Sequence, residues 1–454
     1  MSQLPKGWVE TTLVNIANWG SGGTPKRSES SYYGGDTPWV KTGDLGPKRL
    51  STASEYISQA GLDNSSAKLF PKGSVAIAMY GATIGKTSIL DFDTTTNQAC
   101  AVGNPFEGVT NTEFLYYFLN SEKQRFIDKG KGGAQPNISQ QMIKAHEVML
   151  PPLAEQQRIV EKLDEVLAQV DTIKARLDGI PAIIKRFRQS VLAAAVSGKL
   201  TLLVKEPPKF TKLGDTGVEI KTGPFGSALH KSDYIEGGIS VINPMHINDG
   251  KITPATQMSI TSEKYESLAA WHLKDDDVVV GRRGEMGRAA VVKGTSLEPC
   301  LCGTGSMILR CGEYISSEYL SYVIRSPVAV SYFNATSVGS TMVNLNQKVI
   351  KSLEVYFPPI EEQKEIVRLV YQYFAFADTI EAQVKKAQAR VDNLTQSILA
   401  KAFRGELVPQ DSDDEPAEKL LERIAEARKE AEALAKAAKK AEAVRKKAAK
   451  AASA

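Results

Sequence analysis

The feature that most limits how this chain can fold is an internal repeat. Residues 150–200 and 357–407 align without a gap at an offset of 207, with roughly 19 of 51 positions identical. The shared residues include Pro-Pro and Glu-Gln at the start, Asp-Thr-Ile in the middle, and Gln-Ser and Gly-x-Leu at the end. Because chance does not produce such a match, the chain contains two copies of one structural element.

Both copies place apolar residues at alternating steps of four and three, which is the pattern of a coiled-coil seam. Pro pairs at 151–152 and 358–359 mark helix starts, and Gly198 and Gly405 mark helix ends. Each copy predicts a helix of about 43 residues, roughly 60–65 Å long, and Pro181 should bend the first helix. We expect the two helices to pair with each other antiparallel, whereas an oligomerisation coil is the alternative. The predicted seam residues are Ile159, Leu163, Val170, Ile173, Leu177, Ile184, Ile366, Val370, Ile380, Val384, Val391 and Ile398.

The segments before the two helices form a second level of repetition. Each has a β-like run that ends in a glycine-bearing turn (residues 80–86 and 282–288), followed by an aromatic helix. Each then has a Gly/Ser loop and an Asn-apolar-polar triplet, at residues 137–139 and 344–346. We therefore predict an α+β fold with a pseudo-two-fold internal repeat. Its predicted parts are globular domains at 1–149 and 206–356, coiled-coil helices at 150–205 and 357–410, and a charged helical tail at 411–454.

Composition excludes several classes of protein. The 454 residues are 42% hydrophobic and 24% charged with a net charge of +4, which is typical of an ordinary globular chain. No run approaches the roughly 18 apolar residues of a membrane span, and the start lacks a signal-peptide layout, so we expect a cytoplasmic protein without membrane contact. The four cysteines form no C-x2-C pair, and small buried residues are a better interpretation than a metal site.

Catalytic motifs are not found in the sequence either. The run from Tyr80 to Thr87, YGATIGKT, resembles a phosphate loop but has three residues between its glycines where a Walker A motif needs four. The four histidines are scattered, and no helicase or nuclease carboxylate motif is present. The Pro pairs lack the Asn or Asp that amino-methyltransferases place before theirs. We therefore expect no catalytic residues, no metal ligands and no cofactor in this chain.

The arrangement resembles the specificity (S) subunit of type I restriction–modification systems. The resemblance covers nearly the whole chain through LPPLAEQQRIV, FPPIEEQKEIV, TPWVKTGDL, YGATIGKTSIL, GGAQPNIS and the closing FRGELVPQD. It implies that each globule is a target recognition domain for one half of an asymmetric bipartite DNA site, with a spacing set by the helices. It also implies binding of double-stranded DNA, of two adenine-N6 methyltransferase (M) subunits and of motor-nuclease (R) subunits. S-adenosylmethionine, ATP and Mg would then bind to those partners.

Residues for DNA recognition should lie in the polar-aromatic loops of the two globules. Arg, Lys, Asn and Gln side chains can hydrogen-bond to base edges, and cations or backbone donors hold phosphates. Asn137 and Asn344 could instead cap the following element, and of two successive arginines pleating should turn one inward. The candidates are Trp39, Lys41, Tyr80, Thr83, Lys86, Lys131, Gln135, Asn137, Phe225, His230, Asn243, His246, Arg282, Arg283, Arg288, Ser340, Asn344, Asn346 and Lys348.

Two other functions and the role of the tail remain open from the sequence. A coiled-coil scaffold without sequence-specific DNA binding would leave the cationic loops unused, and a stand-alone enzyme would need an active site that no motif indicates. The tail from Pro416 is rich in Ala, Lys and Glu. It is expected to be a solvated helix, with non-specific DNA contact or packing on a partner subunit as alternatives.

Overall fold

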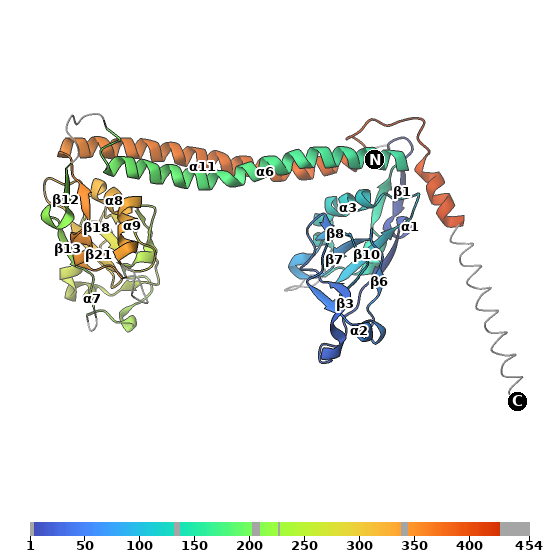
Figure 1. Cartoon of the computed structure of the whole chain (residues 1–454), viewed down its shortest axis with the longest axis horizontal. Helices are drawn as coiled ribbons and strands as arrows, with labels where there is room; N and C mark the ends of the chain where they lie inside the picture. Colours follow the sequence, from blue (N-terminus) through green and yellow to red (C-terminus); the bar gives the residue numbers. More distant parts are fainter. Residues whose placement is uncertain (1–3, 131–136, 202–208, 226–227, 337–343, 427–454) are drawn as a thin grey trace, which may run out of the picture. The chain divides into compact units, whose positions relative to one another are not determined.

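The computed structural model describes residues 4–130, 137–201, 209–225, 228–336 and 344–426 (Figure 1). The chain divides into two compact units, which we call unit 1 (residues 1–175 and 388–454) and unit 2 (residues 176–387). Each unit contains one globule, a part of α6 (Leu153–Val196) and a part of α11 (Ile360–Ala402).

The described globule of unit 1 contains two sheets and a two-stranded ribbon. The order in the larger sheet is β2-β10-β7-β8-β4, in the smaller one β5-β3-β9-β6, and the ribbon pairs β1 with β11. Strands β7 and β8 are buried at every residue, because α3 packs against one face and a cluster with Val40, Leu45 and Phe70 covers the other. The elements are β1 (Val9–Thr12), α1 (Leu13–Ile16), β2 (Ala17–Ser21), η1 (Ser30–Tyr32), β3 (Tyr33–Val40), β4 (Arg49–Leu50), β5 (Glu55–Ile57), α2 (Gln59–Asp63), β6 (Leu69–Phe70), β7 (Val75–Ala78), η2 (Gly81–Thr83), β8 (Thr87–Leu90), β9 (Thr94–Thr96), β10 (Cys100–Pro105), α3 (Thr112–Ser121), α4 (Lys123–Lys129), α5 (Gln140–Lys144) and β11 (Glu147–Leu150).

The described globule of unit 2 repeats the strand order of these sheets with one strand fewer in each, and it adds a two-stranded sheet of β15 and β16. Its larger sheet has the order β13-β21-β18-β19, its smaller one β17-β14-β20, and β12 pairs with β22 in the ribbon. In both smaller sheets one pair is parallel, β3 with β9 and β14 with β20. The elements are β12 (Phe210–Lys212), η3 (Leu213–Asp215), β13 (Glu219–Thr222), η5 (Lys231–Asp233), β14 (Ile239–Ile242), η6 (Pro244–His246), β15 (Ile247–Asn248), β16 (Lys251–Ile252), β17 (Ser259–Ile260), α7 (Ser262–Ser267), η7 (Ala269–Trp271), β18 (Val278–Gly281), β19 (Ala289–Val291), β20 (Cys300–Cys302), β21 (Ser306–Arg310), α8 (Ser317–Arg325), α9 (Pro327–Thr336), α10 (Gln347–Lys351) and β22 (Glu354–Tyr356).

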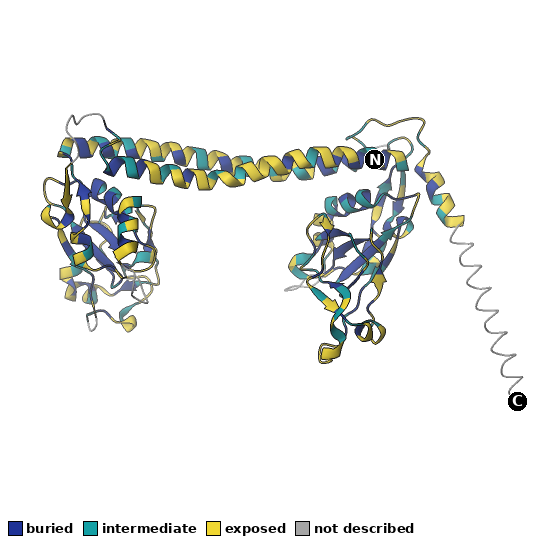
Figure 2. Ribbon diagram, viewed as in Figure 1, coloured by how far each residue is buried: buried dark blue, intermediate teal, exposed yellow. Residues whose placement is uncertain are grey.

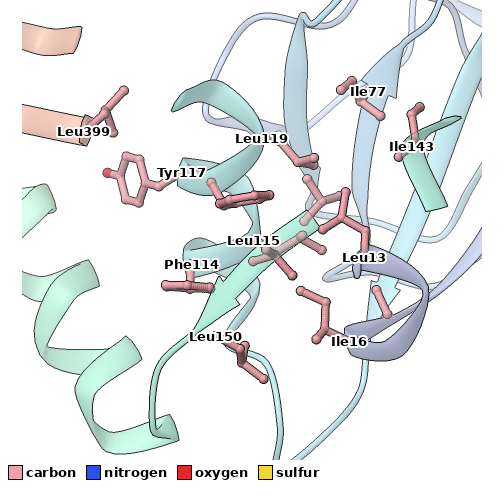
Figure 3. Packing of buried hydrophobic residues seen from close by; sticks show 14 of the residues in the cluster. Leu13, Ile16, Ile77, Phe114, Leu115, Tyr117, Leu119, Ile143, Leu150 and Leu399 are labelled. Carbon is pink, nitrogen blue, oxygen red and sulfur yellow. The ribbon is translucent and has the colours of Figure 1, made fainter. Parts of the chain in front are cut away.

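The core of unit 1 joins the globule to the long helices. Phe114 and Leu115 of α3 are fully buried and pack in one cluster with Ile77 of β7 and with Leu399 of α11 (Figure 3). The Phe114 ring also meets the Phe403 ring edge-on, with 5.4 Å between centroids. Because α3 lies between sheet and helices, the aromatic helix links the β domain to the coil.

The two long helices are antiparallel. In unit 1 the start of α6 packs with the end of α11, and in unit 2 the end of α6 packs with the start of α11. Ion pairs run between the helices from Lys174 to Asp392 (2.8 Å) in unit 1 and from Arg188 to Asp378 (2.5 Å) in unit 2. Figure 2 shows buried and exposed residues alternating along both helices, as a seam requires.

The ends of the helices follow from local chemistry. Both begin directly after the Pro pairs, where the missing N–H of proline costs nothing. Gly198 and Gly405 have positive φ angles of 71° and 73°. The next residue in each case donates its N–H to the carbonyl five positions earlier, which is the Schellman end of a helix. The first helix continues through Pro181.

Burial along the coil supports most seam positions and contradicts one. Ile173 is 46% exposed, so the prediction that it lies buried in the seam is wrong. Nearby, Lys174 pairs with Asp392 and Leu394 is also 46% exposed, so the two helices bury little apolar surface there. The buried positions are Ile159, Leu163, Val170, Ile184, Ile366, Val370, Val384 and Ile398, and the half-buried ones are Leu177, Ile380 and Val391.

The repeated Glu-Gln motif joins each long helix to its own globule. In unit 1 the buried Gln156 amide donates to the carbonyls of Val109 (2.9 Å) and Pro151 (3.1 Å) and accepts from Asn111 N (2.9 Å). In unit 2 Gln363 makes the same three bonds, to Tyr314 O, Pro358 O and Ser316 N. These bonds tie the start of the long helix to the segment that begins the aromatic helix, which explains why Gln recurs at an offset of 207.

The first part of the tail packs on unit 1. Ala417 and Leu420 are 0% and 2% exposed and belong to the core of unit 1. Ala417 N donates to Gly7 O (2.9 Å), and Asp414 pairs with Arg158 (2.6 Å). The expectation of a solvated helix is therefore wrong for this part, because Ala417 and Leu420 cover apolar surface of the same chain. The later tail, residues 427–454, lies outside the described residues.

Candidate nucleic-acid interface

Both globules hold the end of a central strand against a distant loop by the same main-chain hydrogen bonds. In unit 1 Ala78 N donates to Lys86 O (2.9 Å) and Met79 N to Ala99 O (2.8 Å), while Ile138 N donates to Met79 O (3.0 Å). We call this set of bonds, with residues 78–80 and 137–138, the strand-end frame of unit 1. It fixes two exposed side chains, Tyr80 and Asn137, as bridge partners beside one another.

Unit 2 has the same frame. Gly281 N donates to Arg288 O (2.8 Å), Arg282 N to Gly305 O (2.9 Å) and Leu345 N to Arg282 O (2.8 Å). Arg283 and Asn344 are the bridge partners here, and both are exposed. Arg283 is thus equivalent to Tyr80, Arg282 to Met79, and Asn344 to Asn137.

The second and third residues of each Asn-apolar-polar triplet have different structural roles. The middle residues Ile138 and Leu345 are buried at 1% and 0% exposure and anchor the loops in the cores. The helix caps are the third residues: Ser139 accepts from Met142 N (3.2 Å) and Asn346 accepts from Val349 N (3.0 Å). Asn137 and Asn344 therefore do not cap these helices, whereas Asn346, a predicted DNA contact, does.

The two arginines that follow β18 point to opposite sides, as pleating predicts. Arg283 is exposed, whereas Arg282 is only 6% exposed, which contradicts a direct base contact by Arg282. Its Nε donates to Asn344 Oδ1 (3.1 Å), and the Phe225 ring covers its guanidinium at 4.8 Å. Phe225 itself is 54% exposed. Burial and the neighbouring Arg283 lower the pKa of Arg282.

The turn of unit 1 carries fewer charged residues than that of unit 2. Tyr80 is 44% exposed. Thr83 and Lys86 are half-buried, and the Thr83 hydroxyl donates to Tyr80 O (2.8 Å), which stiffens the turn. The left-handed φ angles of Gly81 (59°) and Gly85 (76°) allow the chain to reverse here.

Two predicted contacts are buried inside the globules, so the prediction is wrong for them. Trp39 is 2% exposed and its indole N–H donates to Gly23 O (3.0 Å). His246 is 3% exposed and its Nδ1 accepts from Asn243 N (3.2 Å), while burial lowers its pKa. Both ring systems find internal hydrogen-bond partners, which loop composition alone does not reveal.

Three further candidates are half-buried and engaged within the protein. Lys41 pairs with Glu55 (3.0 Å), and Arg288 bonds to Pro244 O, Asn248 and Glu285 at 3.0–3.1 Å. The Asn243 amide faces Tyr234 and lies against Gly303, where a Cβ would approach its Oδ1 to 2.2 Å. The polar groups of these three residues are thus engaged in contacts within their own globules.

The remaining candidates divide into exposed and undescribed residues. His230 and Lys348 are exposed, whereas Lys131, Gln135 and Ser340 lie outside the described residues. Lys348 lines a hollow of about 520 Å³ together with Lys212 and Lys351. Lys212 is the last residue of β12 and Lys351 the last residue of α10, and neither was among the predicted candidates.

Other kinds of site find no support in the described part of the chain. No group of His, Cys, Asp and Glu residues there could hold a metal ion. All four cysteines are free, and burial raises the pKa of the Cys300 thiol to about 11, so it is protonated at neutral pH. None of the described helices is long and apolar enough to span a membrane.

Comparison with known proteins agrees with this geometry. A family model described as the type I restriction modification DNA specificity domain matches residues 5–182 and 209–388. The specificity subunit of the type I restriction enzyme EcoKI from Escherichia coli K12 is 33% identical over 458 residues, covering 94% of this chain and 96% of the relative. That of StySPI from Salmonella potsdam is 31% identical over 448 residues, again covering 94% and 96%.

Solved structures support the same fold. A chain from a study of complex assembly and conformational transition in the type I R-M system superposes with a TM-score of 0.67 at 20% identity, covering 89% of this chain and all of that one. The HsdS subunit of Thermoanaerobacter tengcongensis gives a TM-score of 0.54 at 20% identity, covering 89% and 98%.

The family model matches each globule together with its part of the helices, so the chain belongs to the class of DNA-specificity proteins with two similar halves. The chain belongs to the family of type I restriction–modification DNA specificity subunits. Its role is therefore recognition of a DNA target and not catalysis itself.

Proposed function

We propose that this chain selects an asymmetric bipartite DNA target for a type I restriction–modification complex, with one half-site for each globule. The observation that carries the proposal is the pair of strand-end frames, which present Tyr80 with Asn137 in unit 1 and Arg283 with Asn344 in unit 2. A tyrosine and an arginine at the same position offer different groups to a base edge. Different half-sites follow from this difference.

We also propose that the long helices bind two methyltransferase (M) subunits, through which motor-nuclease (R) subunits join. Support comes from large apolar side chains on the helices of unit 2, where Tyr371, Phe376 and Ile183 are 71%, 60% and 54% exposed. Tyr371 and Phe376 both lie on α11 and Ile183 lies on α6. Large exposed apolar side chains that lie close together are typical of a protein-binding surface. In this proposal S-adenosylmethionine, ATP and Mg bind to the partner subunits.

Methylation profiling tests the proposal. A host that lacks other such systems would receive this chain together with its methyltransferase subunit, and methylated adenines would be mapped across the genome. We expect one new motif with two unlike halves separated by a fixed non-specific spacer. A continuous motif would contradict the bipartite arrangement. Absence of any new motif, with an active methyltransferase, would favour a scaffold without sequence-specific binding.

A further inference from the structure

In unit 2 a buried cation lies where unit 1 has an apolar side chain. Arg282 and Met79 are equivalent in the two strand-end frames, and they are 6% and 3% exposed. Within the described residues no carboxylate pairs with Arg282, and its Nη1 is buried without a hydrogen-bond partner. Burying an unpaired charge costs free energy, so folding alone does not explain an arginine at a place where methionine suffices.

The contact that Arg282 does make fixes the orientation of an exposed amide. Its Nε lies 3.1 Å from Asn344 Oδ1. A guanidinium only donates hydrogen bonds, so the Asn344 atom that faces it must be the oxygen. The Asn344 amide nitrogen consequently points away from Arg282, and the residue is exposed. Phe225, which lies over the guanidinium, restricts its movement further.

We propose that Arg282 is a positioning residue, which holds Asn344 with its amide nitrogen outward to donate to an acceptor on DNA. The acceptor is a nitrogen or oxygen of a base edge or an oxygen of the phosphate backbone. This inference rests on the proposed function and adds to it which partner donates in one contact, namely the Asn344 amide nitrogen. In unit 1 the apolar Met79 offers no donor, so Asn137 lacks this restraint.

The decisive variant is Arg282→Met, because it installs the residue that the same frame already holds in unit 1. The assembled complex would bind duplexes with the methylated sequence and with single base changes in each half. With an acceptor on a base edge, discrimination in the half-site of unit 2 should fall at least tenfold, and with an acceptor on the phosphate backbone, binding to every sequence should weaken at least tenfold. Discrimination in the half-site of unit 1 should stay unchanged in both cases. Because Arg282 is buried, the dependence of log Kd on log salt should keep its slope. Arg282→Lys retains a donor and should restore part of the discrimination.

Two outcomes would overturn this inference. Unchanged discrimination together with unchanged affinity in Arg282→Met would mean that Arg282 does not position Asn344 for recognition. A salt slope lowered by about one unit would make Arg282 itself a phosphate ligand. A wild-type complex without preference in either half-site would instead refute the proposed function, so the two failures are distinguishable.

Asn344→Asp separates folding from recognition. A carboxylate keeps an acceptor toward Arg282 and adds an ion pair, so thermal stability should stay equal or rise, while the donor to DNA is lost. Asn346→Asp is the matched control, because it adds the same charge two residues away and aspartate still caps α10. We expect at least tenfold weaker binding for Asn344→Asp than for Asn346→Asp, and equal binding would refute the donor role. With Asn344→Ala, a loss confined to one base pair assigns the acceptor to a base edge, and a uniform loss assigns it to phosphate.

Discussion

Replacing Gln156 with leucine should loosen the junction between the globule of unit 1 and its long helix. Gln156 is fully buried and makes three hydrogen bonds, so the substitution removes one partner each from Asn111 N, Val109 O and Pro151 O. Each unsatisfied buried group costs about 1–3 kcal/mol. Because neighbouring groups relax together, we expect a total of roughly 3–6 kcal/mol, which is large against the roughly 5–15 kcal/mol that stabilises a domain.

Hydrogen exchange at increasing urea is the suitable assay, since a chain with two units does not unfold in one step. Amides of residues 111–119 should lose protection in Gln156→Leu, whereas amides of residues 316–324 in unit 2 should keep it. Gln157→Leu is the control, because Gln157 is exposed and bonds only to Asn111 Nδ2 and Glu161 among described residues. Its effect should be about 0.5 kcal/mol. Equal losses in the two variants, or equal effects in both units, would refute the role of Gln156.

Three further outcomes are expected. Ile366→Asp places an unpaired charge at a fully buried position and should lower the free energy of unfolding in urea by several kcal/mol. Ile173→Asp, at a 46% exposed position, should lower it by less than about 1 kcal/mol. Similar losses in the two variants would contradict the seam described above. Leu420→Asp should speed proteolysis of unit 1 while Glu422→Asp, at an exposed position, leaves it unchanged, and equal rates would mean that the tail does not stabilise this unit. Exchanging residues 1–149 for the corresponding globule of another family member should change one half-site in methylation profiling, and a change in both would refute separate recognition.

The helices were predictable because their signals are local. Proline before the first turn and glycine in the left-handed region after the last act within a few residues, so the sequence contains the whole cause. Burial at a seam position depends in addition on the side chains of the facing helix. Ile173 shows this. It is apolar and stands at a heptad position, but it lies next to the ion pair of Lys174 with Asp392 and stays 46% exposed.

The site was predictable only as far as strand geometry determines it. Pleating predicted that one of Arg282 and Arg283 turns inward, but which one depends on where the sheet packs against the rest of unit 2. Trp39 and His246 were mistaken for surface residues because polar-aromatic loops are common on surfaces. Their partners, Gly23 O and the backbone of Asn243, belong to the folded chain and carry no sequence signature.

The strand-end frames also bear on how such a protein can evolve. Their bonds join main-chain N–H groups to main-chain carbonyls, so they form whatever side chain stands at the exposed positions. A mutation of Tyr80 or Arg283 can therefore alter the surface that we propose to face DNA while these main-chain bonds remain intact. Arg282 is the exception, since its partner is the side chain of Asn344. On the proposed function, single substitutions in unit 1 should be enough to change specificity, whereas in unit 2 Arg282 and Asn344 are expected to change together.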